Sequence, residues 1–256
     1  MIGAIIGDIC GSVYEKERAE SIDFELFTPL STFTDDTILS VAVADATLNN
    51  LPYDKTLQSY AKAYPRRWYG ASFWQWVDSE ELKPYGSYAN GSAMRVSSIG
   101  WLAKNEHEVL SLAQKSAQIT HNHIEGINGA KAVALAIFLA KNGATKEEIR
   151  SRISKDFSYD LSHSFQEELL LSRGFDSTCK GSIPPAILAF LDSNSYEHAI
   201  RNAIWLKGDA DTQACIAGAI AQAYYGYIPS FMIDKAYEIL PNKFIKIIEN
   251  VMDFKA

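Results

Sequence analysis

Three glycines near the start of the chain constrain its fold more than any other feature. Gly3, Gly7 and Gly11 are spaced four residues apart in the apolar run 2–14, so a helix would place them on one face. Each interior glycine costs a helix up to roughly 1 kcal/mol relative to alanine, which requires a compensating contact. We therefore expect another backbone to approach this face closely. The alternative is a glycine-rich strand and phosphate loop, although the spacing matches neither a P-loop nor a dinucleotide-binding fingerprint.

A second helix of small side chains is predicted for residues 213–225, which read Gln-Ala-Cys-Ile-Ala-Gly-Ala-Ile-Ala-Gln-Ala-Tyr-Tyr. Just before it, Gly208–Thr212 supplies two carboxylates and a hydroxyl. Asp211 or Thr212 is a candidate N-cap, because its side chain can accept hydrogen bonds from free backbone N–H groups. Residues Thr34–Thr37 have the same character and precede another apolar segment. Two oxygen-rich helix starts in one chain suggest a shared site.

The rest of the chain predicts an all-α protein, because helical periodicity recurs and convincing period-two alternation is absent. We find no linker, no fixed repeat and no low-complexity tract, and we expect one compact domain, 1–256, built as a bundle of many helices. The further helices are expected at residues 36–48, 54–64, 93–103, 108–118, 129–141, 145–154, 163–173, from 183 onward, 196–206, 230–239 and 242–254.

One segment does not fit a helix. Residues 66–89 are rich in tryptophan, tyrosine, glycine and serine. This composition favours an irregular loop that forms one wall of a ligand cleft. A surface loop whose aromatic side chains fold back onto the core is the alternative.

Composition excludes several classes of protein. A formal charge of −7 argues against a general nucleic-acid binder or an anionic-membrane binder, since these present a basic face. The longest apolar run, 132–140, is about half a membrane span. Asp8 lies too early for a secretion signal, so we expect a cytoplasmic protein. The cysteines, Cys10, Cys179 and Cys215, are far apart and are expected to be reduced and buried.

The two oxygen-rich stretches predict a metal site if they converge. Four carboxylates a few ångströms apart cannot all be ionised without a large cost, so either some are protonated or a cation lies among them. Neither stretch contains histidine or cysteine, which favours Mg²⁺, Mn²⁺ or Ca²⁺ over zinc. Four carboxylates would support two such ions. Sequence spacing alone does not establish the convergence.

Four motifs together resemble the ADP-ribosylglycohydrolase family, which includes the dinitrogen reductase-activating glycohydrolase and the ADP-ribosyl-acceptor hydrolases. They are Gly-Asp-x-x-Gly-x-x-x-Glu at 7–15, Phe-Thr-Asp-Asp-Thr at 33–37, Asn-Gly-Ser-Ala-Met-Arg at 90–95 and Gly-Asp-Ala-Asp-Thr at 208–212, with Ala-Gly-Ala-Ile at 217–220. Any one motif would be weak, whereas the set in this order is highly specific. The similarity extends from near residue 2 to about residue 229.

The resemblance implies a compact all-α fold with two Mg²⁺ or Mn²⁺ ions in a cleft that binds ADP-ribose. It implies that Glu15 lies near the metals and the scissile bond, and that Asp35 and Asp209 are catalytic as well. The implied metal ligands are Thr34, Asp35, Asp36, Asp209, Asp211 and Thr212. The implied substrate-binding residues are Asn90, Gly91, Ser92, Met94 and His121. For His121, an ordinary histidine at a helix end remains the alternative.

Three positions depart from the family pattern. Lys207 stands where many members have glycine, which adds an ammonium group beside the acidic loop. Residues 183–185 read Ile-Pro-Pro where many relatives carry an acid after the first proline, and Ala89 replaces a common glycine. None of these removes an implied metal ligand. They put substrate contacts in more doubt than metal binding, and we expect Lys207 to point to solvent.

The implied activity is metal-dependent release of ADP-ribose from a modified protein, small molecule or nucleic acid. Cleavage at the anomeric carbon builds oxocarbenium character, so the site should stabilise positive charge and assist the leaving group. The alternatives are a non-catalytic ADP-ribose or nucleotide sensor, a structural protein on the same scaffold, and a metal-dependent nucleotide phosphohydrolase. Acceptor choice is expected to depend on the aromatic loop 66–89 and on segment 145–182.

Overall fold

The computed structural model describes residues 1–171 and 174–254. Within these residues the secondary structure is helical, with no strand and one isolated bridge between Ala89 and Thr178. The all-α prediction is therefore confirmed. The helices are α1 Ile2–Gly11, α2 Asp35–Leu48, α3 Tyr53–Ala63, α4 Ala71–Asp78, α5 Gly91–Met94, α6 Ser97–Leu102, α7 Glu106–Gln118, α8 Ile124–Lys141, α9 Lys146–Phe157, α10 Phe165–Leu171, α11 Cys179–Asp192, α12 Tyr196–Trp205, α13 Ala210–Tyr225, α14 Ser230–Ile239 and α15 Asn242–Met252.

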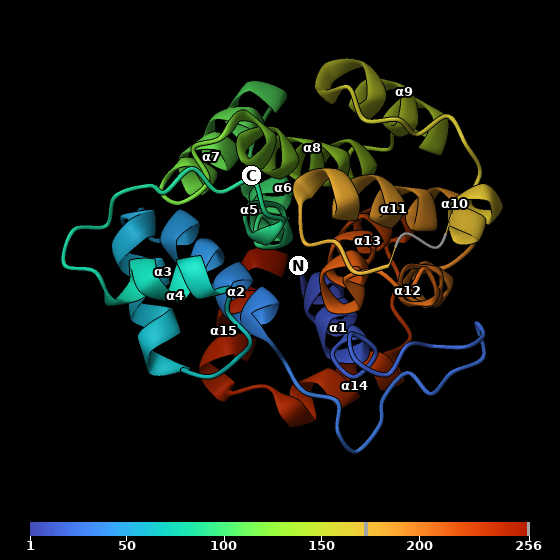
Figure 1. The fold of residues 1–256 in the computed structure, drawn as a ribbon, viewed down its shortest axis with the longest axis horizontal. Coiled ribbons are helices and arrows are strands. Elements are labelled where there is room, and N and C mark those ends of the chain that lie inside the picture. Colours follow the sequence, from blue (N-terminus) through green and yellow to red (C-terminus); the bar gives the residue numbers. More distant parts are fainter. Residues whose placement is uncertain (172–173, 255–256) are drawn as a thin grey trace.

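Helix α13 lies at the centre of the molecule, with α1, α11 and α12 around it (Figure 1). The glycine face of α1 packs directly against α13. A Cβ atom added to Gly7 would lie 2.1 Å from the carbonyl oxygen of Ala214, and one added to Gly3 would lie 2.6 Å from that of Gly218. Such distances are incompatible with any side chain, so the close approach expected from the glycine spacing is confirmed. The strand-and-phosphate-loop alternative is wrong.

This central pair belongs to a single hydrophobic cluster that draws side chains from α1 through α15. Helices α2 and α8 also contribute many of its side chains. Helices α3 and α4 lie on one side of the molecule, and α9 and α10 lie at the opposite edge (Figure 1). All three cysteines are buried and unpaired, as expected. No helix among the described residues is long and apolar enough to cross a membrane. The expected single domain, 1–256, stays a prediction.

Several predicted boundaries need correction. The helix predicted at 93–103 is two short helices, α5 and α6, separated by Arg95 and Val96. Helix α8 begins earlier than expected, at Ile124, because the His123 side chain accepts a hydrogen bond from the N–H of Glu125 and caps the helix. Helix α11 begins at Cys179, ahead of Pro184, because the Thr178 hydroxyl accepts from the N–H of Gly181. The end of the helix predicted at 163–173 lies outside the described residues.

The loop prediction for residues 66–89 is also partly wrong, because the segment contains the two-turn helix α4. Phe73 and Trp76 are buried in the core, so these two aromatic side chains fold back onto the core, as the alternative interpretation predicted. The flanking residues are irregular. Trp68 even adopts a left-handed conformation, with φ of 66°, and leaves 45% of its surface exposed.

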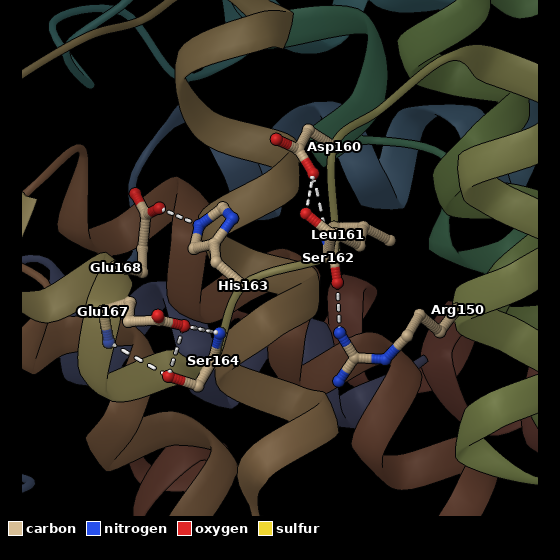
Figure 2. A network of polar contacts seen from close by, with 8 residues as sticks. All are labelled: Arg150, Asp160, Leu161, Ser162, His163, Ser164, Glu167 and Glu168. Atoms are coloured by element: carbon tan, nitrogen blue, oxygen red, sulfur yellow. Dashed lines mark hydrogen bonds and ion pairs between the residues drawn. The ribbon is translucent and has the colours of Figure 1, made fainter.

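The charged segment from α9 to α10 is held by its own polar network (Figure 2). Arg150 donates to the carbonyl of Leu161, and the imidazole of His163 lies 2.5 Å from a carboxylate oxygen of Glu168. The Ser164 hydroxyl accepts from the N–H of Glu167 and caps α10. These contacts hold the turn between the two helices, which lies away from the central pair.

Candidate active site

A cleft of about 600 Å³ opens at the start of α13. This volume falls within the range of small-molecule sites, roughly 300–1,000 Å³. Its lining residues fall into two sets by chemistry, which we call the acidic wall and the neutral wall, and the second of these is mostly neutral and aromatic. The acidic side consists of Glu15, Asp35, Asp36, Asp209, Asp211 and Thr212. The other side includes Trp68, Tyr85, Ser87, Tyr88, Asn90, Gly91, Met94, Arg95, His121, Phe175, Ser177 and Thr178.

The two oxygen-rich helix starts, those of α2 and α13, converge in this cleft. The Thr212 hydroxyl donates to a carboxylate oxygen of Asp36 over 3.4 Å, although the two residues are 176 positions apart. Carboxylate oxygens of Asp8, Asp36 and Asp211 all lie within 4.8 Å of one another. The convergence that sequence spacing could not establish is therefore present in the fold.

The start of α2 is organised by Asp8, a fully buried carboxylate on α1. Its oxygens accept from the hydroxyl of Thr34 over 2.7 Å and from that of Thr37 over 2.5 Å. They also accept from the backbone N–H groups of the same two residues, over 3.0 and 3.1 Å. Thr34 caps α2 as predicted, since its hydroxyl oxygen accepts from the N–H of Asp36. Asp8 thus fixes the orientation of the turn that carries Asp35 and Asp36.

The start of α13 differs from the prediction. Neither Asp211 nor Thr212 is the N-cap, because α13 begins at Ala210 and its N-cap is Asp209, whose side chain makes no capping hydrogen bond. The Asp209 carboxylate instead accepts from the side-chain amide of Asn90 over 2.7 Å. Asn90 also donates to the hydroxyl of Ser182. The carboxylate that could have capped the helix is thereby held at the cleft.

The acidic wall carries more negative charge than the described protein groups neutralise. Burial is the main reason that the pKa values of Asp36 and Asp211 lie well above the usual range. Neighbouring carboxylates, led by Asp8 for Asp36 and by Asp209 for Asp211, raise them further. Oxygen Oδ1 of Asp36 is buried without a hydrogen-bond partner among the described residues. A hard divalent cation fits a set of oxygen donors with such an orphaned acceptor.

Glu15 follows α1 and lies half-buried in the cleft. Burial raises the pKa of this carboxyl above its ordinary value, and the negative charge of Asp209 raises it further. A carboxyl with a raised pKa is able to hold a proton closer to neutral pH than an exposed glutamate can.

The structure brings four of the five implied substrate residues to the cleft. Asn90, Gly91, Met94 and His121 line it, whereas Ser92 does not. Ser92 is fully buried and its hydroxyl donates to the carbonyl of Gly126 over 2.7 Å, so it joins α5 to α8 instead. Thr34 is likewise absent from the lining, because its hydroxyl is directed to Asp8.

The remaining predictions concern the rim of the cleft. Exposed aromatic side chains of Trp68, Tyr88 and Phe175 line it, which agrees with a role for loop 66–89 as one wall. Within the charged segment 145–182, the described residues that line the cleft are Phe175, Ser177 and Thr178, and the residues drawn in Figure 2 are not among the lining residues. Lys207 is partly exposed and is not among the lining residues.

Sequence reasoning missed the role of Asp8 as a hydrogen-bonding centre and the buried position of Arg95 in the cleft wall. The signal for Asp8 was available, because an acid in an otherwise apolar, glycine-striped helix must find buried donors. For Arg95 the signal was weaker. The residue stands in a polar motif whose burial depends on how α5 packs between α7, α8 and α13.

Comparisons with known proteins point to one family. The family model described as ADP-ribosylglycohydrolase matches residues 1–253. The chain is 29% identical over 305 residues to ADP-ribosylhydrolase ARH3 of Mus musculus, covering 88% of this chain and 82% of that protein. It is 27% identical over 266 residues to ADP-ribosylarginine hydrolase Tri1 of Pseudomonas putida (strain GB-1), covering 88% and 69%.

A solved structure described as an ADP-ribosylglycohydrolase-related protein complex has the same fold. It superposes with a TM-score of 0.71 at 21% sequence identity, over 98% of this chain and 95% of the other. This likeness supports the helical architecture.

Proposed function

The chain belongs to the ADP-ribosylglycohydrolase family, and from this premise we propose that it is a metal-dependent hydrolase that releases ADP-ribose from an ADP-ribosylated acceptor. The bond cleaved is the one at the anomeric carbon of the distal ribose. The observation that carries the proposal is the convergence of carboxylates from the starts of α2 and α13 beside a cleft of small-molecule size. The acceptor would be a modified protein, small molecule or nucleic acid.

The cations proposed for this site are two Mg²⁺ or Mn²⁺ ions, held by Asp35, Asp36, Asp209, Asp211 and Thr212. Thr34, which the sequence also implied, would need to turn its hydroxyl from Asp8 to join them. When bound, they would supply positive charge that anchors ribose hydroxyls and acidifies water. The protein's contribution is to keep the oxygen donors oriented before substrate arrives. Asn90 does this for Asp209 with a 2.7 Å hydrogen bond, and Asp8 does it for the turn at Asp35 and Asp36.

Glu15 is proposed to move the proton. Its carboxyl lies on the acidic side of the cleft, where burial and the charge of Asp209 raise its pKa. A protonated Glu15 would pass its proton to the departing acceptor atom as the bond to the anomeric carbon breaks and that carbon develops positive charge. Water would then add to the carbon and return a proton to Glu15. The carboxylates of Asp35 and Asp209 lie on the same wall and would stabilise that charge.

A panel of substrates tests the proposal. Purified protein with Mg²⁺ or Mn²⁺ is incubated with arginine-, serine- and nucleic-acid-linked ADP-ribose and with an O-acyl ADP-ribose, and products are read by mass spectrometry. ADP-ribose is the expected product, lost in Asp35→Ala and reduced in Glu15→Ala. Release of AMP would indicate a phosphohydrolase instead. Binding of ADP-ribose with no turnover on any substrate, while a known hydrolase acts, would identify a sensor.

A further inference from the structure

His121 is enclosed in the neutral wall of the cleft, and only 3% of its surface is exposed. A Cβ atom added to Gly126 would lie 2.8 Å from the Cβ atom of His121, and one added to Gly91 would lie 3.4 Å from its Nε2 atom. The ring therefore lies between two glycines that leave room for it. Its Nε2 atom has no hydrogen-bond partner among the described residues, and His121 lines the cleft.

The other ring nitrogen is engaged. Nδ1 of His121 lies 2.7 Å from the hydroxyl oxygen of Thr120. The same oxygen accepts a hydrogen bond from Nη2 of Arg95 over 3.0 Å, and Arg95 also donates to the carbonyl of Ser116 over 2.7 Å. Arg95 is completely buried. Its Nε and Nη1 atoms are buried without a hydrogen-bond partner among the described residues, so its hydrogen bonds to the protein are those of Nη2.

A count of protons assigns the direction of the Thr120–His121 hydrogen bond. The hydroxyl has one proton, and arginine offers donors only, so Thr120 must accept from Arg95. Its proton can then go to Nδ1 of His121 at 2.7 Å or to the carbonyl of Ala117 at 3.5 Å. The second distance is at the limit of a hydrogen bond. The short contact therefore takes the proton, and Nδ1 is the acceptor.

Electrostatics favours the same assignment. Burial, followed by the positive charge of Arg95, lowers the pKa of His121 well below its usual value, so the ring is neutral at neutral pH. A neutral imidazole has a positive N–H end and a negative lone-pair end. The arrangement with the lone pair on Nδ1, toward Arg95, and the proton on the distant Nε2 has the lower energy beside a cation.

We propose that Arg95, acting through Thr120, holds His121 as the Nε2–H tautomer, so that His121 presents a hydrogen-bond donor to the cleft. A ligand in this position must then offer an acceptor, such as a phosphate oxygen or a ring nitrogen. Arg95 and Thr120 are positioning residues, which act on the ligand through His121. The tautomer does not depend on the proposed function, whereas the identity of the ligand rests on it.

The tautomer can be measured without any ligand. Long-range proton–nitrogen NMR spectra of ¹⁵N-histidine-labelled protein distinguish protonated from unprotonated ring nitrogens, and His121→Gln identifies the His121 signals by their loss. Wild type and Thr120→Ser should both show a protonated Nε2 and a bare Nδ1. Thr120→Val, which is nearly isosteric but lacks the hydroxyl, and Arg95→Met should lose this preference. A protonated Nδ1 in the folded wild type would overturn the proposal, whatever the variants do.

Binding of ADP-ribose tests the consequence. In His121→Gln the side-chain NH₂ occupies about the place of Nε2, whereas in His121→Asn it occupies about that of Nδ1. Loss of one neutral hydrogen bond corresponds to roughly 2- to 12-fold in Kd. We expect His121→Asn to weaken binding by about that factor and His121→Gln to weaken it less. The reverse order would contradict a donor at Nε2. If wild type binds no ADP-ribose, the proposed function fails while the tautomer result stands.

Discussion

The two walls of the cleft solve the problem of buried charge in different ways. The acidic wall, formed by Glu15, Asp35, Asp36, Asp209, Asp211 and Thr212, holds carboxylates that the described protein groups do not neutralise. The neutral wall contains one buried charge, Arg95, whose Nη2 atom donates to Ser116 and Thr120 while its Nε and Nη1 atoms have no partner among the described residues. On the acidic wall several like charges lie together and require a cation, whereas on the neutral wall a single positive charge lies near a neutral His121.

The largest effect is expected on the acidic wall. Asp36→Ala removes a carboxylate whose Oδ1 atom has no protein partner, and we expect ADP-ribose release to fall at least about 100-fold because a cation ligand is lost. Asp54→Ala is the matched control, because Asp54 also lies in the first turn of a helix, α3, but does not line the cleft. Full activity in Asp36→Ala would show that the unpartnered charge has no catalytic purpose.

Loss of the hydrogen bonds that Asp8 accepts at the start of α2 should have a somewhat smaller effect. Asp8→Asn keeps the shape of the side chain but replaces one acceptor oxygen by a donor, facing the groups of Thr34 and Thr37 that now donate to Asp8. We expect metal affinity to fall by about 10- to 100-fold, in line with other residues that orient ligands. Calorimetric titration with Mn²⁺ measures it. Affinity equal to wild type in a folded Asp8→Asn would mean that the turn at Asp35 and Asp36 needs no such support.

The raised pKa values on the acidic wall also predict how the stability of the folded protein depends on pH. The pKa values of Asp36 and Asp211 are raised by folding, so the native state binds more protons than the unfolded chain above about pH 4. Without divalent cations, stability should therefore fall as pH rises from about 4 toward neutral. Asp36→Asn should raise the cation-free unfolding free energy at pH 7 by about 1–3 kcal/mol. Thermal unfolding in a chelator, with and without added Mn²⁺, measures both; a less stable Asp36→Asn would contradict the excess of charge.

The smallest effect concerns the neutral wall. Gly91→Ala places a methyl group in van der Waals contact with Nε2 of His121, at 3.4 Å, where it would take up space beside the proposed donor without reaching Arg95. We expect ADP-ribose binding to weaken by about 2- to 5-fold, less than the loss of a complete hydrogen bond. Gly70→Ala is the control, because Gly70 also lines the cleft but has no atom near an added Cβ. Equal affinities of the two variants for ADP-ribose would show that the ligand does not approach Gly91.

The sequence predicted those features that depend on local spacing. Gly3 and Gly7 at helical intervals predicted the close packing of α1 on α13, and the Thr34 cap of α2 followed from residue type alone. The N-cap predicted for α13, Asp211 or Thr212, was wrong because the helix begins earlier, at Ala210, and its N-cap Asp209 accepts from the side chain of Asn90 instead of capping. Ser92 was misplaced for a similar reason, since its motif does not reveal that the hydroxyl turns toward Gly126. The positions of these side chains therefore depend on contacts between distant segments, which residue spacing does not reveal.

The most direct test of the metal-dependent hydrolase is a titration of chelator-treated protein with Mn²⁺, in which bound ions and ADP-ribose release are measured in the same samples. We expect no release without the cation, and release that rises with bound Mn²⁺ and levels off near two ions per chain, as for a binuclear site. Full release by protein shown to be free of metal would contradict it.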